Sequence, residues 1–298
     1  GAMGGGIGKM LAKKTGVDIV GAIDIGDKIG KSLYDVVPGI VRGDREDVIV
    51  GTPEEVIKPG AADIVVVCTN SFTKDVYDKL VFVMEKGMNV ITSAEEMAYP
   101  QAQEPELAKK LDEIAKKNGV SVMGTGINPG LIMDLLVILW TAACEEVNHV
   151  TSRRVNSLSP FGPAVMEEQG IGISVEEFNE RKANGTMAGH VGFAESTMMI
   201  CDALGWKWDD FGQDMEPIVT DVDRKSPYGF AAAGQVAGVA MKGWVNIDGE
   251  RKIDMDHPQQ IEPEQVGVHT GDYVILDSVP PVNMVNTPEI EGGIGTMA

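Results

Sequence analysis

The segment Asp63-Ile64-Val65-Val66-Val67-Cys68-Thr69-Asn70-Ser71 decides how the first half of the chain folds. Its run of four branched apolar residues favours a strand that is covered on both faces, as in a parallel sheet. Short polar residues follow at once, at the carboxyl end of a parallel strand, which is where ligands bind in such sheets. The segment therefore predicts an α/β domain whose binding loops lie along this edge.

Strand and helix patterns alternate around this segment from Gly6 to about Thr125. The other predicted strands are Asp18–Ile23, Asp47–Val50, Asn89–Thr92 and Val120–Gly124, and the predicted helices include Ile7–Lys14, Lys74–Lys86 and Glu104–Asn118. Such alternation is typical of a doubly wound parallel sheet. We therefore predict a Rossmann-like dinucleotide-binding domain over residues 1–130.

The pattern changes after residue 130. An apolar helix through Leu131 to Cys144 precedes a strand at His149–Leu158, followed by helices at Val175–Asn184 and Val191–Leu204. Two later β-rich runs are joined by Asp248-Gly249, a strong hairpin signal, and span Gln235–Ile247 and Arg251–Ile261. Pro280-Pro281 indicates a turn between two strands. Residues 131–298 are thus predicted to form an α+β domain for substrate binding and dimerisation, with a mixed sheet packed with helices.

Charge and cysteine usage exclude several classes of function. The 298 residues hold 25 Lys and Arg against 45 Asp and Glu, a formal net charge of -20. Such a balance argues against partners with phosphate backbones, so we expect neither nucleic-acid nor membrane binding. Three scattered cysteines and the lack of a His cluster at ligand spacing predict no metal site and no disulfide scaffold. A cytoplasmic enzyme is expected.

The glycine-rich start of the chain has the layout of a dinucleotide-binding turn. Gly1, Ala2, Met3 and Gly4 lead into a helix, and a strand ends at Asp24 about twenty residues later. In that layout the helix end binds pyrophosphate and the carboxylate binds the adenosine ribose. A complete fingerprint needs a strand before residue 1, so the first strand is expected to be missing here. The alternatives are that the glycine run is a flexible leader and that Asp24 is only a turn residue.

Several loops taken together indicate a function more specifically than the glycine-rich start does alone. They are Cys68–Phe72, Thr92–Pro100 and Gly124–Gly130, with Gly1–Gly4 before them and Ser159-Pro160-Phe161-Gly162-Pro163 after them. This set resembles the 2,4-diaminopentanoate dehydrogenases, a group of amine dehydrogenases related to dihydrodipicolinate reductase. Family members continue beyond both ends of this chain, with a complete Gly-Leu-Gly-Ala-Met-Gly turn at the start and a segment after Glu291–Gly295.

The resemblance implies oxidative deamination of an amino-acid diamine by NAD or NADP. A carboxylate suits this chemistry because it activates water and stabilises a cationic iminium. Glu96 is our first candidate for the base and Glu95 the second; the alternative is that they cap the next segment or face solvent. Asp24 favours NAD, whereas Lys28 and Lys31 soften that preference, so the choice of cofactor stays open.

The remaining candidate residues would bind the cofactor or the substrate. Cys68, Thr69, Asn70 and Ser71 are expected near the cofactor, although such residues are also ordinary turn formers. Asn128 is a further candidate, with an equal alternative as the N-cap of the apolar helix. For the substrate we expect Arg154 and Asn156, which share a face of one strand, and His190, which could equally be a cap or a satisfied buried histidine.

Two other functions remain as alternatives at this point. One is an imine reductase of the dihydrodipicolinate reductase type, although the His-His motif expected of that family does not occur in the sequence. The other is a regulatory protein that binds NAD(P) without turning it over. By analogy with related enzymes, a homodimer is expected.

Overall fold

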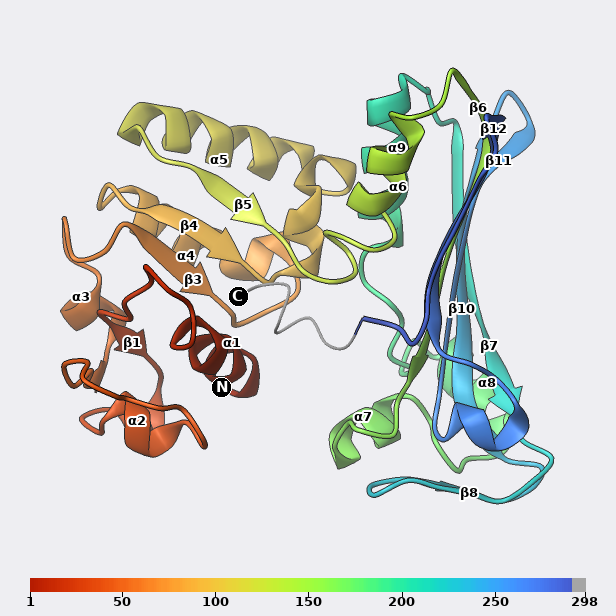
Figure 1. Ribbon diagram of the computed structural model, residues 1–298, viewed down its shortest axis with the longest axis horizontal. Coiled ribbons are helices and arrows are strands. Elements are labelled where there is room, and N and C mark those ends of the chain that lie inside the picture. The colour runs from red at the N-terminus through yellow and green to blue at the C-terminus, as the bar shows by residue number, and fades with distance from the viewer. Residues whose placement is uncertain (291–298) are drawn as a thin grey trace. The chain divides into compact units, whose positions relative to one another are not determined.

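The computed structural model describes residues 1–290, and its contacts divide them into two compact units, Gly1–Leu131 and Ile132–Ile290. Each unit has its own sheets and is described by itself. Glu291–Gly295, which the family resemblance singles out, lies outside the described residues. The predicted fold class, a Rossmann-like parallel sheet with a mixed-sheet α+β domain, is confirmed (Figure 1).

The first unit alternates short strands with helices. Its elements are α1 (Ala2–Leu11), β1 (Ala22–Ile23), α2 (Leu33–Val36), β2 (Val50–Gly51), α3 (Pro53–Val56), β3 (Ile64–Val67), α4 (Thr73–Met84), β4 (Asn89–Thr92), α5 (Pro105–Asn118) and β5 (Val122–Gly124). Short 3-10 helices occupy Gly26–Lys28, Glu95–Ala98 and Pro100–Ala102.

The parallel strands of this unit form two sheets. One has the order β3-β4-β5, with Val65 opposite Val90 and Val90 opposite Val122. The other pairs β1 with β2. Among residues 1–290, β1 has no strand partner besides β2, and β3 has none besides β4. The predicted doubly wound sheet is therefore divided into two halves.

The core of the larger half lies under α4 and α5, which pack against one another and against the strands (Figure 1). Apolar residues recur three or four positions apart along α4, so one face of this helix is buried. They pack with residues of β4 and α5 in one cluster that includes Val76, Leu80, Val83, Met84, Val90 and Leu111. This layer fixes the loops that follow β3 and β4.

The glycine run at the start of the chain is helical, so the flexible-leader alternative is wrong. Helix α1 begins at Ala2, five residues earlier than predicted, and contains Gly4, Gly5 and Gly6. Its Ile7 is 2% exposed, and Ala12 just beyond its end belongs to a second core cluster with Leu33, Ile40 and Val48. Packing of this apolar stripe stabilises a helix that its glycines alone would not favour.

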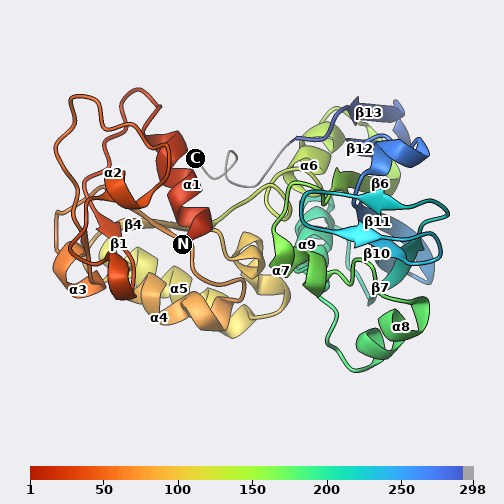
Figure 2. The ribbon, with the colours of Figure 1, turned by 90° about the horizontal axis from the view of Figure 1, so that it is seen from below.

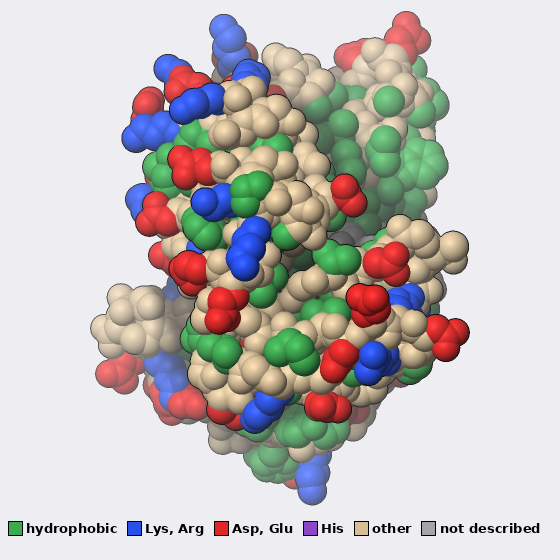
Figure 3. All heavy atoms as spheres, turned by 90° about the vertical axis from the view of Figure 1, so that its left-hand side faces the viewer, with side chains coloured by type: hydrophobic (Ala, Val, Ile, Leu, Met, Phe, Trp, Pro, Cys, Tyr) green, Lys and Arg blue, Asp and Glu red, His purple; other side chains and the backbone are tan. Residues whose placement is uncertain are grey.

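Both signs of charge are present on the surface of this unit. Figure 3 shows Lys and Arg side chains interspersed with Asp and Glu over the face that it displays. This face therefore does not present a field of one sign. No helix of the described residues is long and apolar enough to cross a bilayer.

The second unit is built on one large mixed sheet. Its strands are β6 (Glu146–Ser157), β7 (Asp210–Val219), β10 (Val236–Ile247), β11 (Glu250–Gln260), β12 (Gly271–Val279) and β13 (Val282–Asn286), with a small hairpin of β8 (Arg224–Lys225) and β9 (Phe230–Ala231). Figure 2 shows the order β13-β12-β6-β11-β10-β7. Only β6 and β11 run parallel; the other pairs in this sheet are antiparallel.

Helices α6 (Leu135–Thr141) and α9 (Phe193–Leu204) lie on one face of this sheet. The unit also contains α7 (Pro163–Glu168), α8 (Val175–Ala183), which contacts β7, and a 3-10 helix at Pro263–Val266. Helix α6 contacts β6 and β12, and α9 contacts β10, on the same side of the sheet (Figure 1). The Ser174 hydroxyl caps α8 by accepting from Glu177 N–H at 3.1 Å, as its sequence predicts.

The apolar helix predicted through Leu131 to Cys144 is shorter than expected. Helix α6 begins at Leu135, where the Asp134 carboxylate accepts from the Leu135 N–H at 2.6 Å. Asp134 is fully buried and also accepts from the Ser196 hydroxyl of α9 at 2.8 Å. This carboxylate ties the start of one helix to the other, which the sequence pattern did not indicate.

Candidate active site

The amino end of α1 lies beside the end of β3. A Cβ built on Gly4 would stand 3.8 Å from the Cβ of Cys68. The first backbone bond of the helix joins Gly5 N–H to the Gly1 carbonyl at 2.9 Å, so the N–H groups of residues 2–4 have no intrahelical partner. Free N–H groups at a ten-residue helix suit an anionic group such as a pyrophosphate.

Asp24 follows β1 and is held by donors of its own turn. Its Oδ2 accepts from the Lys28 ammonium at 2.8 Å, and its Oδ1 accepts from Ile25 N–H at 2.8 Å. The hydrogen bond from Lys28, followed by that from Ile25, holds the pKa of Asp24 far below its usual range. Asp24 is therefore an ionised carboxylate held within its turn, and its contact with a ribose stays a prediction.

The polar loop after β3 is tied to α4. The Lys79 ammonium donates to Thr69 Oγ1 at 3.0 Å and to Asn70 Oδ1 at 2.6 Å. The Ser71 carbonyl accepts from Glu96 N–H at 3.1 Å, which joins this loop to the next. Burial raises the pKa of the Cys68 thiol, which therefore stays protonated. Turn formation and ligand contact are compatible here, because Thr69 and Asn70 remain exposed.

Glu95 and Glu96 lie side by side in sequence but in different surroundings. Glu96 is 6% exposed, and its Oε2 accepts from Thr73 N–H in the first turn of α4 at 2.6 Å. Glu95 is half-buried and forms no hydrogen bond or ion pair with the described residues. The Glu96 carboxylate thus bonds the start of the preceding helix α4 and does not cap the segment that follows it, whereas the carboxylate of Glu95 has no partner among the described residues.

The loop Gly124–Gly130 closes this edge of the first unit. Asn128-Pro129 is a cis peptide, and α6 is capped by Asp134, so Asn128 is not the N-cap of that helix. Gly130 has φ 120°, and a Cβ there would lie 2.5 Å from Gly126 N, so only glycine fits. The N-cap alternative for Asn128 is therefore wrong, while a ligand contact stays a prediction.

The first unit therefore has the parts of a dinucleotide site. The helix end has free N–H groups, Asp24 presents a carboxylate, and the loop after β3 presents short polar groups. The donor set fits a phosphate-bridged nucleotide and does not resemble a metal site. Within residues 1–290, no three His, Cys, Asp or Glu side chains come together as metal ligands.

In the second unit, Arg154 and Asn156 lie on the helix-covered face of β6, as alternation predicts. Both are buried, at 5% and 7% exposure, whereas Arg153 on the opposite face is 47% exposed. Arg154 forms an ion pair with the fully buried Asp272 of β12 and donates to the Ile290 carbonyl at 2.7 Å. Its charge is therefore compensated within the protein, which the sequence did not reveal.

His190 lies above the same face of the sheet, stacked on a second histidine. Its ring centroid is 5.0 Å from that of His257 at an interplanar angle of 14°, and 4.7 Å from Phe193. Burial, with a further contribution from Arg154, lowers the pKa of His190 to about 4. Burial, His190 and Arg154 also lower the pKa of His257 well below its usual range. Both rings are thus neutral near pH 7.

Several buried polar atoms in this region lack a hydrogen-bond partner among the described residues. They are His190 Nε2, Asn156 Oδ1 and Ser152 Oγ. Ser152, Arg154 and Asn156 alternate along one face of β6, and His257 lies next to them on β11. An unsatisfied buried polar atom costs about 1–3 kcal/mol, which a polar ligand or an ordered water would recover. This set, with Asp272, is the polar patch of the second unit.

Sequence reasoning missed His257 and Asp272. Their positions depend on strand pairing: β11 runs parallel to β6 with Asp256 opposite Arg153, and Asp272 on β12 is opposite Arg154. The sequence signal was limited to alternation within each strand. Only the register between distant strands brings these side chains to Arg154.

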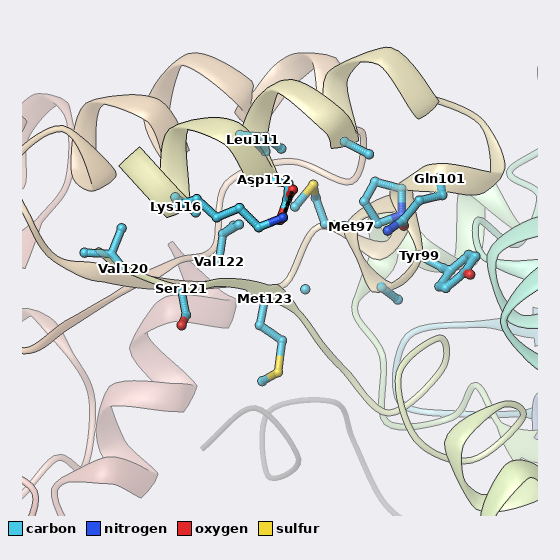
Figure 4. Close-up of a pocket in the computed structure, with 15 residues that line it drawn as sticks. Met97, Tyr99, Gln101, Leu111, Asp112, Lys116, Val120, Ser121, Val122 and Met123 are labelled. Atoms are coloured by element: carbon cyan, nitrogen blue, oxygen red, sulfur yellow. Dashed lines mark hydrogen bonds and ion pairs between the residues drawn. The ribbon is translucent and has the colours of Figure 1, made fainter. Parts of the chain in front are cut away.

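A hollow of about 400 Å³ lies elsewhere in the first unit, between α5 and β5 (Figure 4). Met97, Leu111 and Val122 contribute to its lining, and Lys116 and Asp112 form an ion pair at 2.6 Å beside it. Figure 4 shows Ser121 and Met123 pointing away from α5. None of the candidate cofactor, catalytic or substrate residues lines this hollow.

Comparison with known proteins agrees with this picture. Residues 131–298 match the family described as 2,4-diaminopentanoate dehydrogenase C-terminal domain. The 2,4-diaminopentanoate dehydrogenase of Acetoanaerobium sticklandii is 69% identical over 299 residues, covering 100% of this chain and 84% of that protein.

Solved structures show the same fold. The amine dehydrogenase of Mycobacterium smegmatis has a TM-score of 0.79 at 25% identity, covering 100% of this chain and 86% of that one. A putative myo-inositol dehydrogenase from Sinorhizobium meliloti has a TM-score of 0.56 at 12% identity, over 96% of this chain and 73% of that one. The second likeness shows the fold alone.

Proposed function

Because this chain belongs to the 2,4-diaminopentanoate dehydrogenase family, we propose that it catalyses the NAD(P)-dependent oxidative deamination of 2,4-diaminopentanoate. The products are 2-amino-4-oxopentanoate and ammonia. The observation that carries this proposal is the 69% identity to a 2,4-diaminopentanoate dehydrogenase along the whole chain. That match includes both the dinucleotide-binding unit and the C-terminal domain.

The reaction needs one proton acceptor close to the reacting amine. A nicotinamide cofactor would supply the hydride acceptor when bound. Oxidation of the amine gives an iminium, water adds to its carbon with loss of a proton, and the C–N bond breaks once a proton has been returned to the nitrogen, so that ammonia leaves. The protein must accept a proton from the ammonium group and from the attacking water. A carboxylate near the cationic iminium serves both steps and also stabilises its charge.

We propose Glu95 as this base and Glu96 as the residue that positions it. The Glu96 carboxylate is engaged with Thr73 N–H, whereas the carboxylate of Glu95 has no partner among residues 1–290. A free carboxylate can accept a proton without breaking a buried hydrogen bond. This order reverses the preference for Glu96 that the sequence suggested, for a reason found only in the side-chain contacts.

We propose that the polar patch of the second unit binds the non-reacting end of the substrate. Asn156 Oδ1 and His190 Nε2 are buried and have no hydrogen-bond partner within residues 1–290, so they can exchange hydrogen bonds with an amino-acid ammonium or carboxylate. Arg154 is already paired with Asp272, so the pair adds no net charge to the patch. Arg154 would act on the substrate as a hydrogen-bond donor through its N–H groups. The neutral histidines avoid repelling a substrate that carries ammonium groups.

For the cofactor, we propose that NAD or NADP lies along the edge formed by residues 1–4, Asp24 and Cys68–Ser71, with Asn128 as a further contact. The unpaired helix N–H groups would bind pyrophosphate, and Asp24 would accept from the adenosine ribose. Exposed Thr69 and Asn70 add side-chain donors and acceptors at this edge.

We further propose a cytoplasmic homodimer. All three cysteines are free thiols, which suits a reducing compartment. The face of the large sheet opposite α6 exposes Arg153 and Ile275, at 47% and 41%, and is available for isologous contact. Light scattering of the purified protein at micromolar concentration should give twice the chain mass; the mass of one chain would contradict the dimer.

Comparing substrates tests the proposal against its rivals. Purified protein should reduce NAD or NADP when 2,4-diaminopentanoate is added, and should not oxidise NADH or NADPH with the cyclic imine substrate of dihydrodipicolinate reductases. The reverse pattern would favour the imine reductase. Tight binding of the dinucleotide without turnover of either substrate would favour a regulatory protein.

A further inference from the structure

We propose that Lys28 is the residue that lets the adenosine end of the cofactor site accept the 2′-phosphate of NADP, while Asp24 accepts the 2′-hydroxyl of NAD. The inference rests on the cofactor site of the proposed function and adds the determinant of cofactor choice. Its basis is the contact between Lys28 and Asp24 at the end of β1.

The two groups are held differently. One carboxylate oxygen of Asp24 accepts from the adjacent Ile25 N–H at 2.8 Å, so the carboxylate is fixed to the backbone. Lys28 contacts the other oxygen at 2.8 Å through a flexible side chain that is 37% exposed. An ammonium on four methylenes can leave the carboxylate and bind a phosphate nearby, whereas the carboxylate cannot move away.

A carboxylate at this position normally repels a 2′-phosphate. Here the repulsion is offset locally. Asp24 pairs with Lys28, and Asp27 lies 3.7 Å from Lys31, so this turn carries two charges of each sign in a chain whose net charge is -20. At this turn a doubly charged phosphate would therefore not meet net negative charge.

Lys31 does not satisfy the same conditions. Its partner Asp27 is 92% exposed and the contact is longer, so that pair is solvated and separate from the fixed carboxylate. Lys28 ends the 3-10 helix Gly26–Lys28, which returns the chain toward Asp24. Lys31 therefore provides a matched control that removes the same charge from the same turn.

The test is equilibrium binding of NADH and NADPH, followed by nicotinamide fluorescence, for the native protein and the variants Lys28→Met, Lys28→Arg and Lys31→Met. Calorimetric titration with ADP and with adenosine 2′,5′-bisphosphate measures the affinity of the protein for the adenosine end of the cofactor alone. Lys28→Met should weaken NADPH and the bisphosphate by about tenfold or more, because a charge-assisted contact to phosphate is lost. NADH and ADP should change by less than about threefold, and Lys28→Arg should restore NADPH binding.

Three outcomes would overturn the inference. An equal loss of NADH and NADPH in Lys28→Met would mean that Lys28 only supports the fold of the turn. A selective loss in Lys31→Met would assign the role to the other lysine. If the native protein bound neither dinucleotide, the proposed cofactor site itself would fail. NADH binding by the native protein keeps that failure distinct from the other two.

Discussion

The Glu96 carboxylate accepts a hydrogen bond from the backbone N–H of Thr73 at 2.6 Å, inside the first unit. This bond joins the loop after β4 to the first turn of α4, and Glu96 N–H in turn donates to the Ser71 carbonyl. The two contacts fix the backbone that carries Glu95. Among the described residues, the carboxylate of Glu96 thus has a hydrogen-bond partner and that of Glu95 has none.

Glu95→Gln and Glu96→Gln should therefore differ in kinetics. Replacing the base in Glu95→Gln should lower kcat by about 10²–10⁴-fold while NADH binding stays unchanged. Glu96→Gln keeps an acceptor for Thr73 N–H, so kcat should fall much less. The measurement is steady-state turnover beside dinucleotide binding. A larger loss of kcat in Glu96→Gln would return the role of base to Glu96.

Gly124→Ala should disturb the loop after β4 that carries Glu95 and Glu96, because Gly124 of β5 packs against that loop. A Cβ at Gly124 would lie 2.1 Å from the Met97 carbonyl oxygen, so the backbone after Glu96 must move. We expect a cost of about 1–3 kcal/mol in the free energy of unfolding and a clear drop in kcat. Urea unfolding and turnover measure the two effects. As a control, Gly119→Ala changes a glycine whose Cβ would meet nothing within 4 Å and whose φ is 66°, so it should lose stability by backbone strain but keep kcat.

Replacing only one partner of the Arg154–Asp272 ion pair should strongly lower the free energy of unfolding. Asp272 is fully buried and also accepts from Ile290 N–H at 2.8 Å. Asp272→Asn should cost about 3–5 kcal/mol of unfolding free energy, because it leaves a buried guanidinium without its counter-charge. Chemical denaturation measures this. The double variant Arg154→Met/Asp272→Leu should recover much of the loss, and strictly additive losses would contradict direct pairing.

Stability should depend on pH through His190. Its folded-state pKa of about 4 lies below the ordinary value of 6.5, so acid protonates the unfolded chain first. The contribution of this neutral ring is full above pH 6.5 and is lost as the pH falls toward 4, by up to about 3 kcal/mol. Between pH 4 and 7, the free energy of unfolding, measured by denaturation at each pH, should change less with pH in His190→Gln than in the native protein. An equal change with pH in both proteins would show that His190 titrates normally in the folded state.

The sequence predicted the elements whose signals are local. The bounds of β4 match, and Asp248 and Gly249 form the hairpin turn with φ values of 52° and 79°. These features depend on apolar runs and turn residues within a few positions. Strands β1 and β2 are shorter than predicted, since they pair over only two residues each, Ala22 with Val50 and Ile23 with Gly51.

The candidate site was predictable only in part. Asp24, Arg154 and His190 could be selected from strand ends, alternation and the family resemblance. The burial of Glu96 against Thr73 and the stacking of His257 on His190 arise from contacts between segments distant in sequence. No periodicity within one segment encodes such contacts. For this reason the sequence favoured Glu96 as the base, where the side-chain contacts lead us to propose Glu95, and His257 was missed.

As a member of this amine dehydrogenase family, the chain should oxidise an amine and release its nitrogen. The most direct measurement is the ratio of ammonia to reduced dinucleotide formed from 2,4-diaminopentanoate by the purified protein. We predict a ratio of about one throughout the reaction, because each hydride transfer is followed by hydrolysis of one iminium. Reduction of the dinucleotide without release of ammonia, or no reduction by a protein that binds NADH, would contradict the account.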